Sequence, residues 1–217
     1  MTELATLKEY GAPLRPRIVL WFYYEENDLV GLSREKESTF LLQYLDSDFS
    51  QGLLKRQLEV DKFVLNHIKK QENGEAYRNS RRYKVKNIAT LYDLRQELMS
   101  IINSSLPSQP PPLPLLREIL SEAKDEVNSW DGQLYFVYLP AWNRYGERSN
   151  EDNLHDRHDV LSLVEELEIP IIDFHEAIST HPDPLSLFPF RMPAHYAAEG
   201  YKLLAQQIET YLESTDQ

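Results

Sequence analysis

The sequence predicts an α/β fold in which a mostly parallel sheet is covered by helices. Three short segments, residues 18–24, 134–139 and 169–173, are rich in β-branched and aromatic residues. They lack the alternation of polar and apolar residues that marks a half-exposed strand, as expected for parallel strands buried on both faces. Helical periodicity fills the intervals between them. Strands that alternate with helices favour a three-layer α/β/α arrangement.

Apolar residues recur at helical spacing in five stretches of the chain, and each stretch predicts a helix with one buried face. These faces are Leu54, Leu58, Leu65 and Ile68; Ile88, Leu91, Leu98 and Ile102; Leu116, Ile119, Leu120, Ala123 and Val127; Val160, Leu161, Val164 and Leu167; and Leu204, Ile208, Tyr211 and Leu212. Five prolines within residues 107–114 predict a stiff connection between helices. A ligand for a proline-recognising module is the alternative use of such a segment.

A chain of 217 residues can bury a substantial core, and we interpret residues 1–217 as a single α/β domain. The long helical interval between the first two predicted strands makes residues 33–130 a predicted insertion within it. Three strands are few for a doubly wound sheet, so we expect the sheet to be incomplete on its N-terminal side. Such a sheet has an edge with unpaired backbone groups, which predicts homodimerisation or aggregation through that edge.

Composition excludes several classes of function. A net charge of −12 argues against nucleic-acid binding, which depends on neutralising phosphates. Residues 69–86 are a local exception with seven basic and two acidic residues, which we interpret as a solvated loop, with contact to an anionic surface as the alternative. The chain has no cysteine, hence no disulfide or thiolate metal site. We find no transmembrane segment and no signal peptide, so the chain as given is expected to be cytoplasmic, and we predict no cofactor.

Asn27 is the first candidate for a functional residue. It follows the C-terminal end of the first predicted strand, which is the edge where α/β sheets place their ligands. Its side-chain amide can donate a hydrogen bond to a developing oxyanion during acyl transfer. The alternative is that Asn27 and Asp28 simply form a turn, for which both residues are well suited.

His195 is the second candidate. It follows Pro193 and precedes the last predicted helix, so its imidazole is expected near a helix N-terminus. Such a histidine can take a proton from a hydroxyl nucleophile or activate a water molecule. An ordinary surface or capping histidine is the alternative.

Two further groups of residues are weaker candidates. His155 and His158 are three residues apart and, with Asp173 and His175, could bind a divalent metal; the alternative is the polar first turn of a helix. Residues 142–145 follow the second strand and could line a ligand cleft.

Two blocks of the sequence resemble the SGNH, or GDSL-like, hydrolases. Residues 21–28 (WFYYEEND) resemble the block in which a strand ends in a Gly-x-Asn-Asp turn, and residues 195–201 (HYAAEGY) resemble the block that holds the catalytic histidine. The resemblance implies a flavodoxin-like sheet and hydrolysis or transfer of an ester or acyl group in a small substrate. It also implies that Asn27 is an oxyanion donor, that His195 is the catalytic base, and that Asp173 is a candidate to orient the histidine.

The sequence departs from this family in ways that affect the expected activity. No Gly-Asp-Ser block with a nucleophilic serine precedes Asn27. Met192 stands where the family has its aspartate, Glu26 replaces the glycine of the turn, and Ala197 replaces an asparagine. Because the serine both attacks and is regenerated, we expect an SGNH-like domain that is inactive alone. The alternative is a non-catalytic binding or assembly module that retains the fold.

Overall fold

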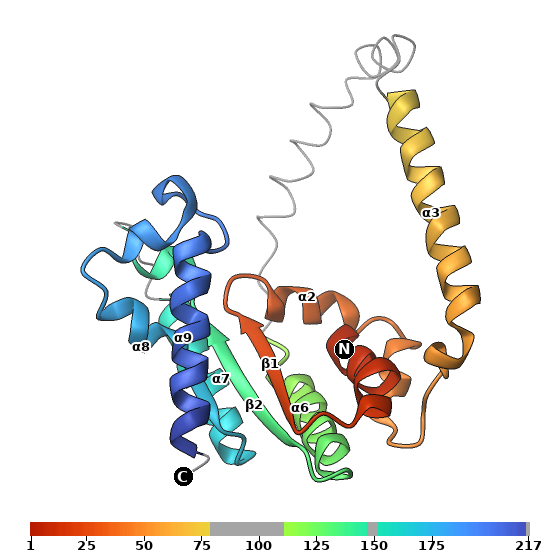
Figure 1. Ribbon diagram of the computed structural model, residues 1–217, viewed down its shortest axis with the longest axis horizontal. Coiled ribbons are helices and arrows are strands. Elements are labelled where there is room, and N and C mark those ends of the chain that lie inside the picture. Colours follow the sequence, from red (N-terminus) through yellow and green to blue (C-terminus); the bar gives the residue numbers. More distant parts are fainter. Residues whose placement is uncertain (79–110, 147–151, 216–217) are drawn as a thin grey trace. The chain divides into compact units, whose positions relative to one another are not determined.

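The computed structural model describes residues 1–78, 111–146 and 152–215, and the side chains of these residues except for 72–78 and 152–156 (Figure 1). The chain divides into two compact units. One comprises Met1–Gln51 with Pro111–Gln217, and the other comprises Gly52–Pro110. The predicted insertion, residues 33–130, contains the whole of the second unit, whereas its two ends belong to the first.

The first unit contains a sheet of three parallel strands in the order β1-β2-β3, which confirms the α/β class and the parallel sheet. The strands are β1 (Ile18–Tyr24), β2 (Gln133–Leu139) and β3 (Ile171–Asp173). The third strand begins two residues later than predicted, because Pro170 precedes it and has no N–H to donate to a ladder. Its carbonyl still accepts a hydrogen bond from the N–H of Phe136 (2.8 Å).

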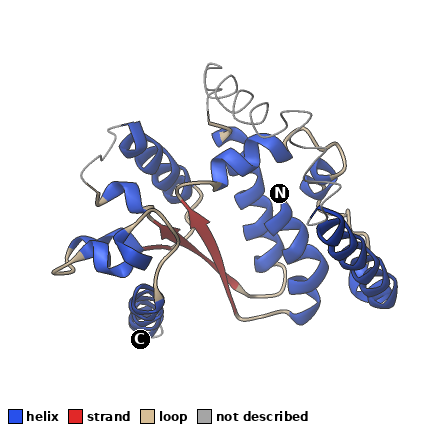
Figure 2. Cartoon of the chain, turned by 90° about the horizontal axis from the view of Figure 1, so that it is seen from above, coloured by secondary structure: helices blue, strands red, loops and turns tan. Residues whose placement is uncertain are grey.

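Helices pack against both faces of the sheet, most completely at the central strand β2, which explains why this strand shows no polar alternation. On one face, Trp21, Tyr23, Phe136 and Tyr138 belong to a core cluster with residues of α1 (Thr2–Thr6), α6 (Leu113–Asn128) and α7 (Asp152–Glu166). On the other face, strand residues such as Val137 form a second cluster with α8 (Phe174–Ser179) and α9 (Ala198–Thr215). Figure 2 shows the strands running between helices on either side.

Apart from α3, the remaining described helical segments have eight residues or fewer. They are η1 (Leu7–Gly11), η2 (Ala12–Leu14), α2 (Asp28–Glu35), η3 (Leu41–Leu45), η4 (Leu53–Arg56), α3 (Gln57–Arg78), η5 (Trp142–Arg144), η6 (Pro184–Leu187) and η7 (Pro189–Arg191). None of the described helices combines the length and the apolar character needed to cross a membrane.

The predicted helical faces have different outcomes. All five apolar residues predicted for α6 are buried, from Leu116 to Val127. The face predicted for α3 is exposed instead: Leu58 is 87% and Leu65 is 55% exposed. The face predicted between Ile88 and Ile102 lies outside the described residues. Periodicity therefore identified helices in the described part, but it did not tell which faces are covered.

Candidate functional site

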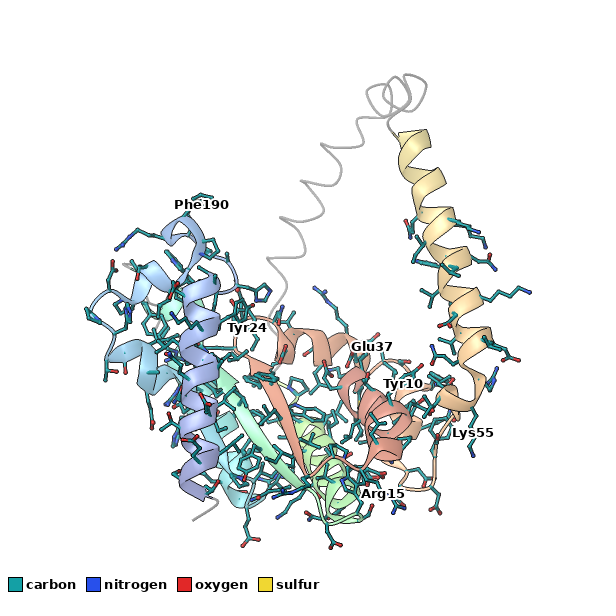
Figure 3. The ribbon with its side chains drawn as sticks, in the orientation of Figure 1. Tyr10, Arg15, Tyr24, Glu37, Lys55 and Phe190 are labelled. Atoms are coloured by element: carbon teal, nitrogen blue, oxygen red, sulfur yellow. The ribbon has the colours of Figure 1, made fainter. Side chains whose placement is uncertain are left out.

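The candidate site lies beyond the C-terminal ends of the three strands. The register aligns Tyr23 with Tyr138 and Tyr138 with Asp173, so all three strands end at one edge of the sheet. Figure 3 labels Tyr24 at the end of β1. The segments that follow β1, β2 and β3 therefore meet at this edge, together with the loop that leads into α9.

A buried ion pair holds the first two of these segments together. Glu25 and Arg144 form an ion pair with side chains that are only 7% and 5% exposed. The Glu25 carboxylate also accepts hydrogen bonds from the N–H of Ala141 (2.9 Å) and from Nε of Arg144 (3.1 Å). Because a buried charge needs partners of this kind, the pair fixes the turn after β1 against the loop after β2. Neither residue was assigned this role from the sequence.

A neutral pair joins the loop after β2 to α8. The Tyr145 hydroxyl lies 2.8 Å from Nδ1 of His175. Burial raises the pKa of Tyr145, so the hydroxyl keeps its proton and the two groups share a hydrogen bond. Burial, together with the charge of Arg157, lowers the pKa of His175 and keeps its imidazole neutral. This histidine is partly buried, whereas His195 is exposed.

Asp173 is engaged by its own neighbours. It caps the N-terminus of α8 by accepting the N–H of His175 (3.0 Å), and it forms an ion pair with Arg157 of α7. Its carbonyl accepts a hydrogen bond from the Gln207 side chain of α9 (2.9 Å). The carboxylate thus pairs with the Arg157 side chain and caps a helix, and a role in orienting His195 stays a prediction.

His195 is exposed and lies against β1. Its ring centroid is 4.7 Å from that of Tyr24, with the two rings tilted by 42°. The next residue, Tyr196, is 5% exposed and donates a hydrogen bond from its hydroxyl to the carbonyl of Pro140 after β2. This anchor fixes the backbone beside His195, while in the described part of the chain the imidazole itself has no hydrogen-bond partner. The ring is positioned by packing and its nitrogens are accessible.

Asn27 lies in the turn that follows Tyr24 at the end of β1. Its N–H donates to the carbonyl of Tyr24 (3.4 Å), and it is the N-cap residue of α2, although its side chain makes no capping hydrogen bond. The residue is exposed. Tyr24 therefore contacts His195 through its ring and Asn27 through its backbone. Of the three predicted site residues, these two gather around Tyr24, whereas Asp173 stands at the end of β3, two strands away.

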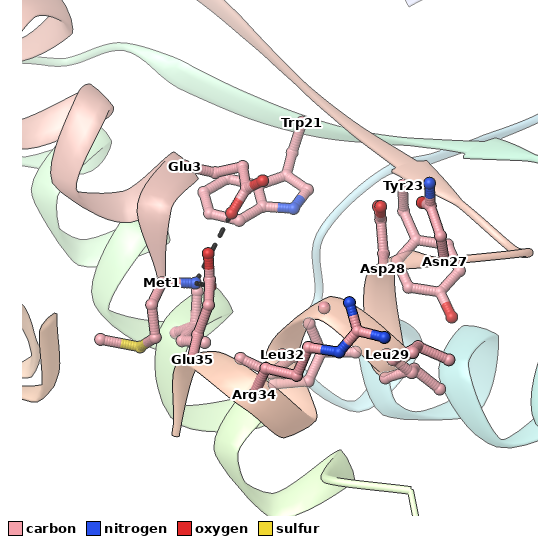
Figure 4. A pocket seen from close by; sticks show the side chains of 14 residues that line it. Met1, Glu3, Trp21, Tyr23, Asn27, Asp28, Leu29, Leu32, Arg34 and Glu35 are labelled. Carbon is pink, nitrogen blue, oxygen red and sulfur yellow. Dashed lines mark ion pairs between the residues drawn. The ribbon is translucent and has the colours of Figure 1, made fainter. Parts of the chain in front are cut away.

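Asn27 also lines a cavity of about 400 Å³ beside α2 (Figure 4). Trp21 and Tyr23 supply apolar walls, and polar groups come from α1 and α2. Among them, Glu35 forms an ion pair with the N-terminal ammonium of Met1 (3.0 Å). The cavity has the mixed lining of a small-molecule site, with the Asn27 amide at its border.

Asp28 is the most perturbed carboxyl group in this cavity. Burial raises its pKa to about 6, against the lowering effect of the Tyr24 N–H that it accepts (2.8 Å). Glu3 and Glu35 add a smaller increase through their negative charge. The folded protein therefore binds a proton at Asp28 at a pH where the unfolded chain has lost it.

This shift predicts a loss of stability between pH 4 and pH 6. The folded-state pKa of Asp28 is about 6, whereas its ordinary value is 3.8. The stabilisation from this group is therefore fully present below the lower value and is lost as the pH rises through the upper one. Asp28→Asn keeps an acceptor for Tyr24 and should remove this dependence, gaining about 1 kcal/mol over the parent at pH 8 after allowance for solvent screening. Urea unfolding of both proteins from pH 4 to pH 8 measures it. The exposed Asp48→Asn is the control and should follow the parent; a parallel profile for Asp28→Asn would contradict the prediction.

The weaker sequence candidates are only partly described. Within the described side chains, no group of three or more histidine, cysteine, aspartate or glutamate residues is arranged to hold a metal ion. The side chain of His155 lies outside them, and His158 is exposed. Arg144 and Tyr145, predicted only as lining residues, take part in the buried contacts described above. Met192, at the position of the family's aspartate, is 60% exposed.

Two signals could have pointed to the residues that sequence reasoning missed. Glu25 stands directly after a buried strand, and Arg144 follows the next strand along the chain, so parallel topology alone brings them to one edge. Arg144 also has the apolar and aromatic residues Trp142 and Tyr145 close by in the sequence, which suggests a buried partner for its charge. Function cannot be taken from relatives, because comparison with family models, curated proteins and solved structures finds no match to this chain.

Proposed function

We propose that this chain carries the histidine and amide components of an SGNH-type acyl-hydrolase or acyl-transferase site, on a flavodoxin-like three-layer α/β/α sheet. The observation that supports it most is the position of His195. Its exposed imidazole lies against Tyr24 at the end of β1, and the backbone of the same tyrosine holds Asn27. A base and an amide donor thus occur together at the sheet edge where α/β proteins bind ligands.

In this proposal His195 acts first as base and then as acid. It takes the proton of an attacking hydroxyl and returns it to the leaving group, which requires an accessible nitrogen and a fixed ring. The Asn27 amide donates a hydrogen bond to the carbonyl oxygen of a small ester or acylated substrate as negative charge develops there. Both residues are exposed, so a substrate can reach them.

The nucleophile belongs to a Gly-Asp-Ser block that this sequence does not contain before Asn27. In the described part of the chain, no serine hydroxyl forms a hydrogen bond with His195 and no carboxylate forms an ion pair with it. We therefore expect the chain alone to hydrolyse esters no faster than buffer, because the proposed site takes its nucleophile from outside these residues. Asp173, bound to Arg157, is the weaker third member of the proposed site.

Hydrolysis of p-nitrophenyl acetate tests this proposal. We compare the chain with the longest protein that the source genome encodes in frame with it. In that longer protein, His195→Ala should lower kcat/KM by about 10³-fold or more, and Asn27→Ala by about 10²-fold, the usual costs of losing a base or an oxyanion donor. His158→Ala, an exposed histidine of α7, is the matched control and should retain full activity. Full activity in both His195→Ala and Asn27→Ala would refute the proposal.

A non-catalytic binding or assembly module is the second candidate. What favours it is that, in the described part of the chain, His195 forms no hydrogen bond with a hydroxyl and no ion pair with a carboxylate. This candidate predicts no ester hydrolysis by any form of the protein, including the longer one.

A further inference from the structure

The outer edge of β1 carries unpaired backbone groups. On the inner side, the carbonyl of Arg17 accepts the N–H of Gln133 (2.9 Å), and the N–H of Glu25 donates to Leu139 (3.0 Å). Successive residues of a strand direct their N–H and C=O groups to opposite sides, so Ile18, Leu20 and Phe22 direct theirs away from β2. Among the described residues these three have no hydrogen-bond partner for those groups.

Among the described residues, this edge is closed only at the C-terminal end of β1. The N–H of Tyr24, which also points outward, donates to the carboxylate of Asp28 (2.8 Å). The outward-facing backbone groups of the three residues Ile18, Leu20 and Phe22, which precede Tyr24 in the strand, therefore remain open. Two of their side chains are substantially exposed as well, Ile18 by 39% and Phe22 by 44%. Long open edges of this kind bind extended chains, and proteins usually protect them.

A groove of about 570 Å³ runs along the open edge. Residues 19–22 of β1 form one wall, and α1 with η1 forms the other through Thr6, Leu7 and Tyr10. In Figures 1 and 2 the N-terminal helix stands beside β1 on the side away from β2. Trp21 and Glu3 line both this groove and the cavity beside Asn27, so the two hollows adjoin.

The helical wall of the groove is fixed to the rest of the unit. Lys8 of η1 forms a buried ion pair with Glu122 of α6 (2.6 Å) and donates to the carbonyl of Asp46 (2.7 Å). The neighbouring Glu9 accepts a hydrogen bond from the Tyr44 hydroxyl (2.9 Å). Because these contacts hold η1 in place, the groove exists before anything occupies it.

The open groups define the chemistry of the occupant. They recur at every second residue, or about 6.8 Å, and each consists of one donor and one acceptor. An extended polypeptide backbone presents complementary groups at the same spacing. The side chains of the occupant that face α1 would meet Leu7 and Trp21, which calls for apolar residues there. Near the cavity, Glu3, with a side chain 60% exposed, and Glu35 share one cation, the N-terminal ammonium of Met1. Two carboxylates against one ammonium leave an excess of negative charge, which favours a basic residue in the occupant.

A second copy of this chain fits the edge poorly. Packed helices lie 8–10 Å apart, about twice the spacing of strands. Because α1 packs beside α6, it lies in the helical layer over the position that a strand added to β1 would take. Another copy paired through its own β1 would bring its own α6 to that place. A lone extended segment brings no helix of its own, and α1 already packs over the position that this segment would take.

We propose that the open edge of β1 and the adjoining groove form a docking site for an extended segment of a partner polypeptide. The segment adds a strand next to β1, with apolar residues at alternate positions and a basic residue near Glu3. This inference does not rest on hydrolase chemistry, and His195→Ala should bind the segment as the parent does.

Hydrogen exchange measured by NMR tests the docking directly. The probe is the blocked peptide Ac-Thr-Val-Thr-Val-Thr-Val-Lys-amide, added to the full chain until binding saturates. The exchange rates of the Leu20 and Phe22 amides should fall by at least about tenfold, since these amides gain hydrogen-bond partners. The amides of Val19 and Trp21 already face β2 and should not change. Absence of binding, or binding without slower exchange at Leu20 and Phe22, would overturn the proposal.

Two variants separate the groove from the fold. Thr6→Trp fills the groove from the exposed side of α1 without altering β1, and it should weaken peptide binding at least about tenfold, as loss of a central contact does. Phe22→Ala keeps the backbone groups and should bind within a factor of about three. If Leu20 and Phe22 are protected without peptide and sedimentation shows a dimer, the occupant is a second copy, as the sequence predicts, and this proposal is wrong.

Discussion

Replacing Glu25 by leucine is expected to lower the free energy of unfolding by about 3 kcal/mol or more, because it leaves Arg144 as a buried charge without its carboxylate. The two side chains are 7% and 5% exposed, so water cannot take over the lost interaction. The N–H of Ala141, which Glu25 accepts at 2.9 Å, loses its partner too. Arg144→Met should cost a similar amount, and urea denaturation at pH 7 measures both.

The double variant decides whether desolvation is the cause. With Glu25→Leu and Arg144→Met together no unpaired charge remains, so the combined loss should be clearly smaller than the sum of the single losses. Asp183 and Arg191 form an ion pair with side chains 46% and 56% exposed, and Asp183→Ala is the control, with little change expected. Additive single losses would mean that the pair is not coupled as described.

Truncation of Phe136 is expected to have the largest effect in the core. The side chain is 0% exposed in the middle of β2, and its ring stacks on that of Tyr23 with centroids 5.5 Å apart. Phe136→Ala removes this packing and leaves a cavity, which costs about 4 kcal/mol. Phe190, at 93% exposed, is the matched control, and Phe190→Ala should leave the unfolding midpoint unchanged. Equal effects of the two substitutions would place Phe136 outside the core.

The strands were predictable because burial on both faces leaves a direct trace in the sequence. An uninterrupted apolar and aromatic run, such as Leu134–Leu139 in β2, has few other uses in a chain this polar. Helices were predictable for a similar reason, as the five buried residues of α6 show. The apolar stripe of α3 failed as an indicator of burial, since periodicity describes one helix and burial needs a second surface.

The polar contacts of the site were less predictable, because they join residues that are distant in the sequence. Glu25 and Arg144 are 119 residues apart, and nothing distinguishes Glu25 from the neighbouring Glu26 before the loops are brought together. Asp173 was predicted to orient His195, but α7 places Arg157 beside it. The proximity of His195 to the turn of Asn27 was expected only through family resemblance, and their roles stay predictions.

The pairing of β1 with β2 joins residues 115 positions apart, from Ile18 to Gln133, and this separation affects how the protein is made. A ribosome adds roughly 5–20 residues each second, so β1 emerges about 6–23 s before the strand that pairs with it. During that interval both edges of an apolar seven-residue segment are open to solvent and to other nascent chains. We therefore expect the β1 segment to need protection by a chaperone during synthesis.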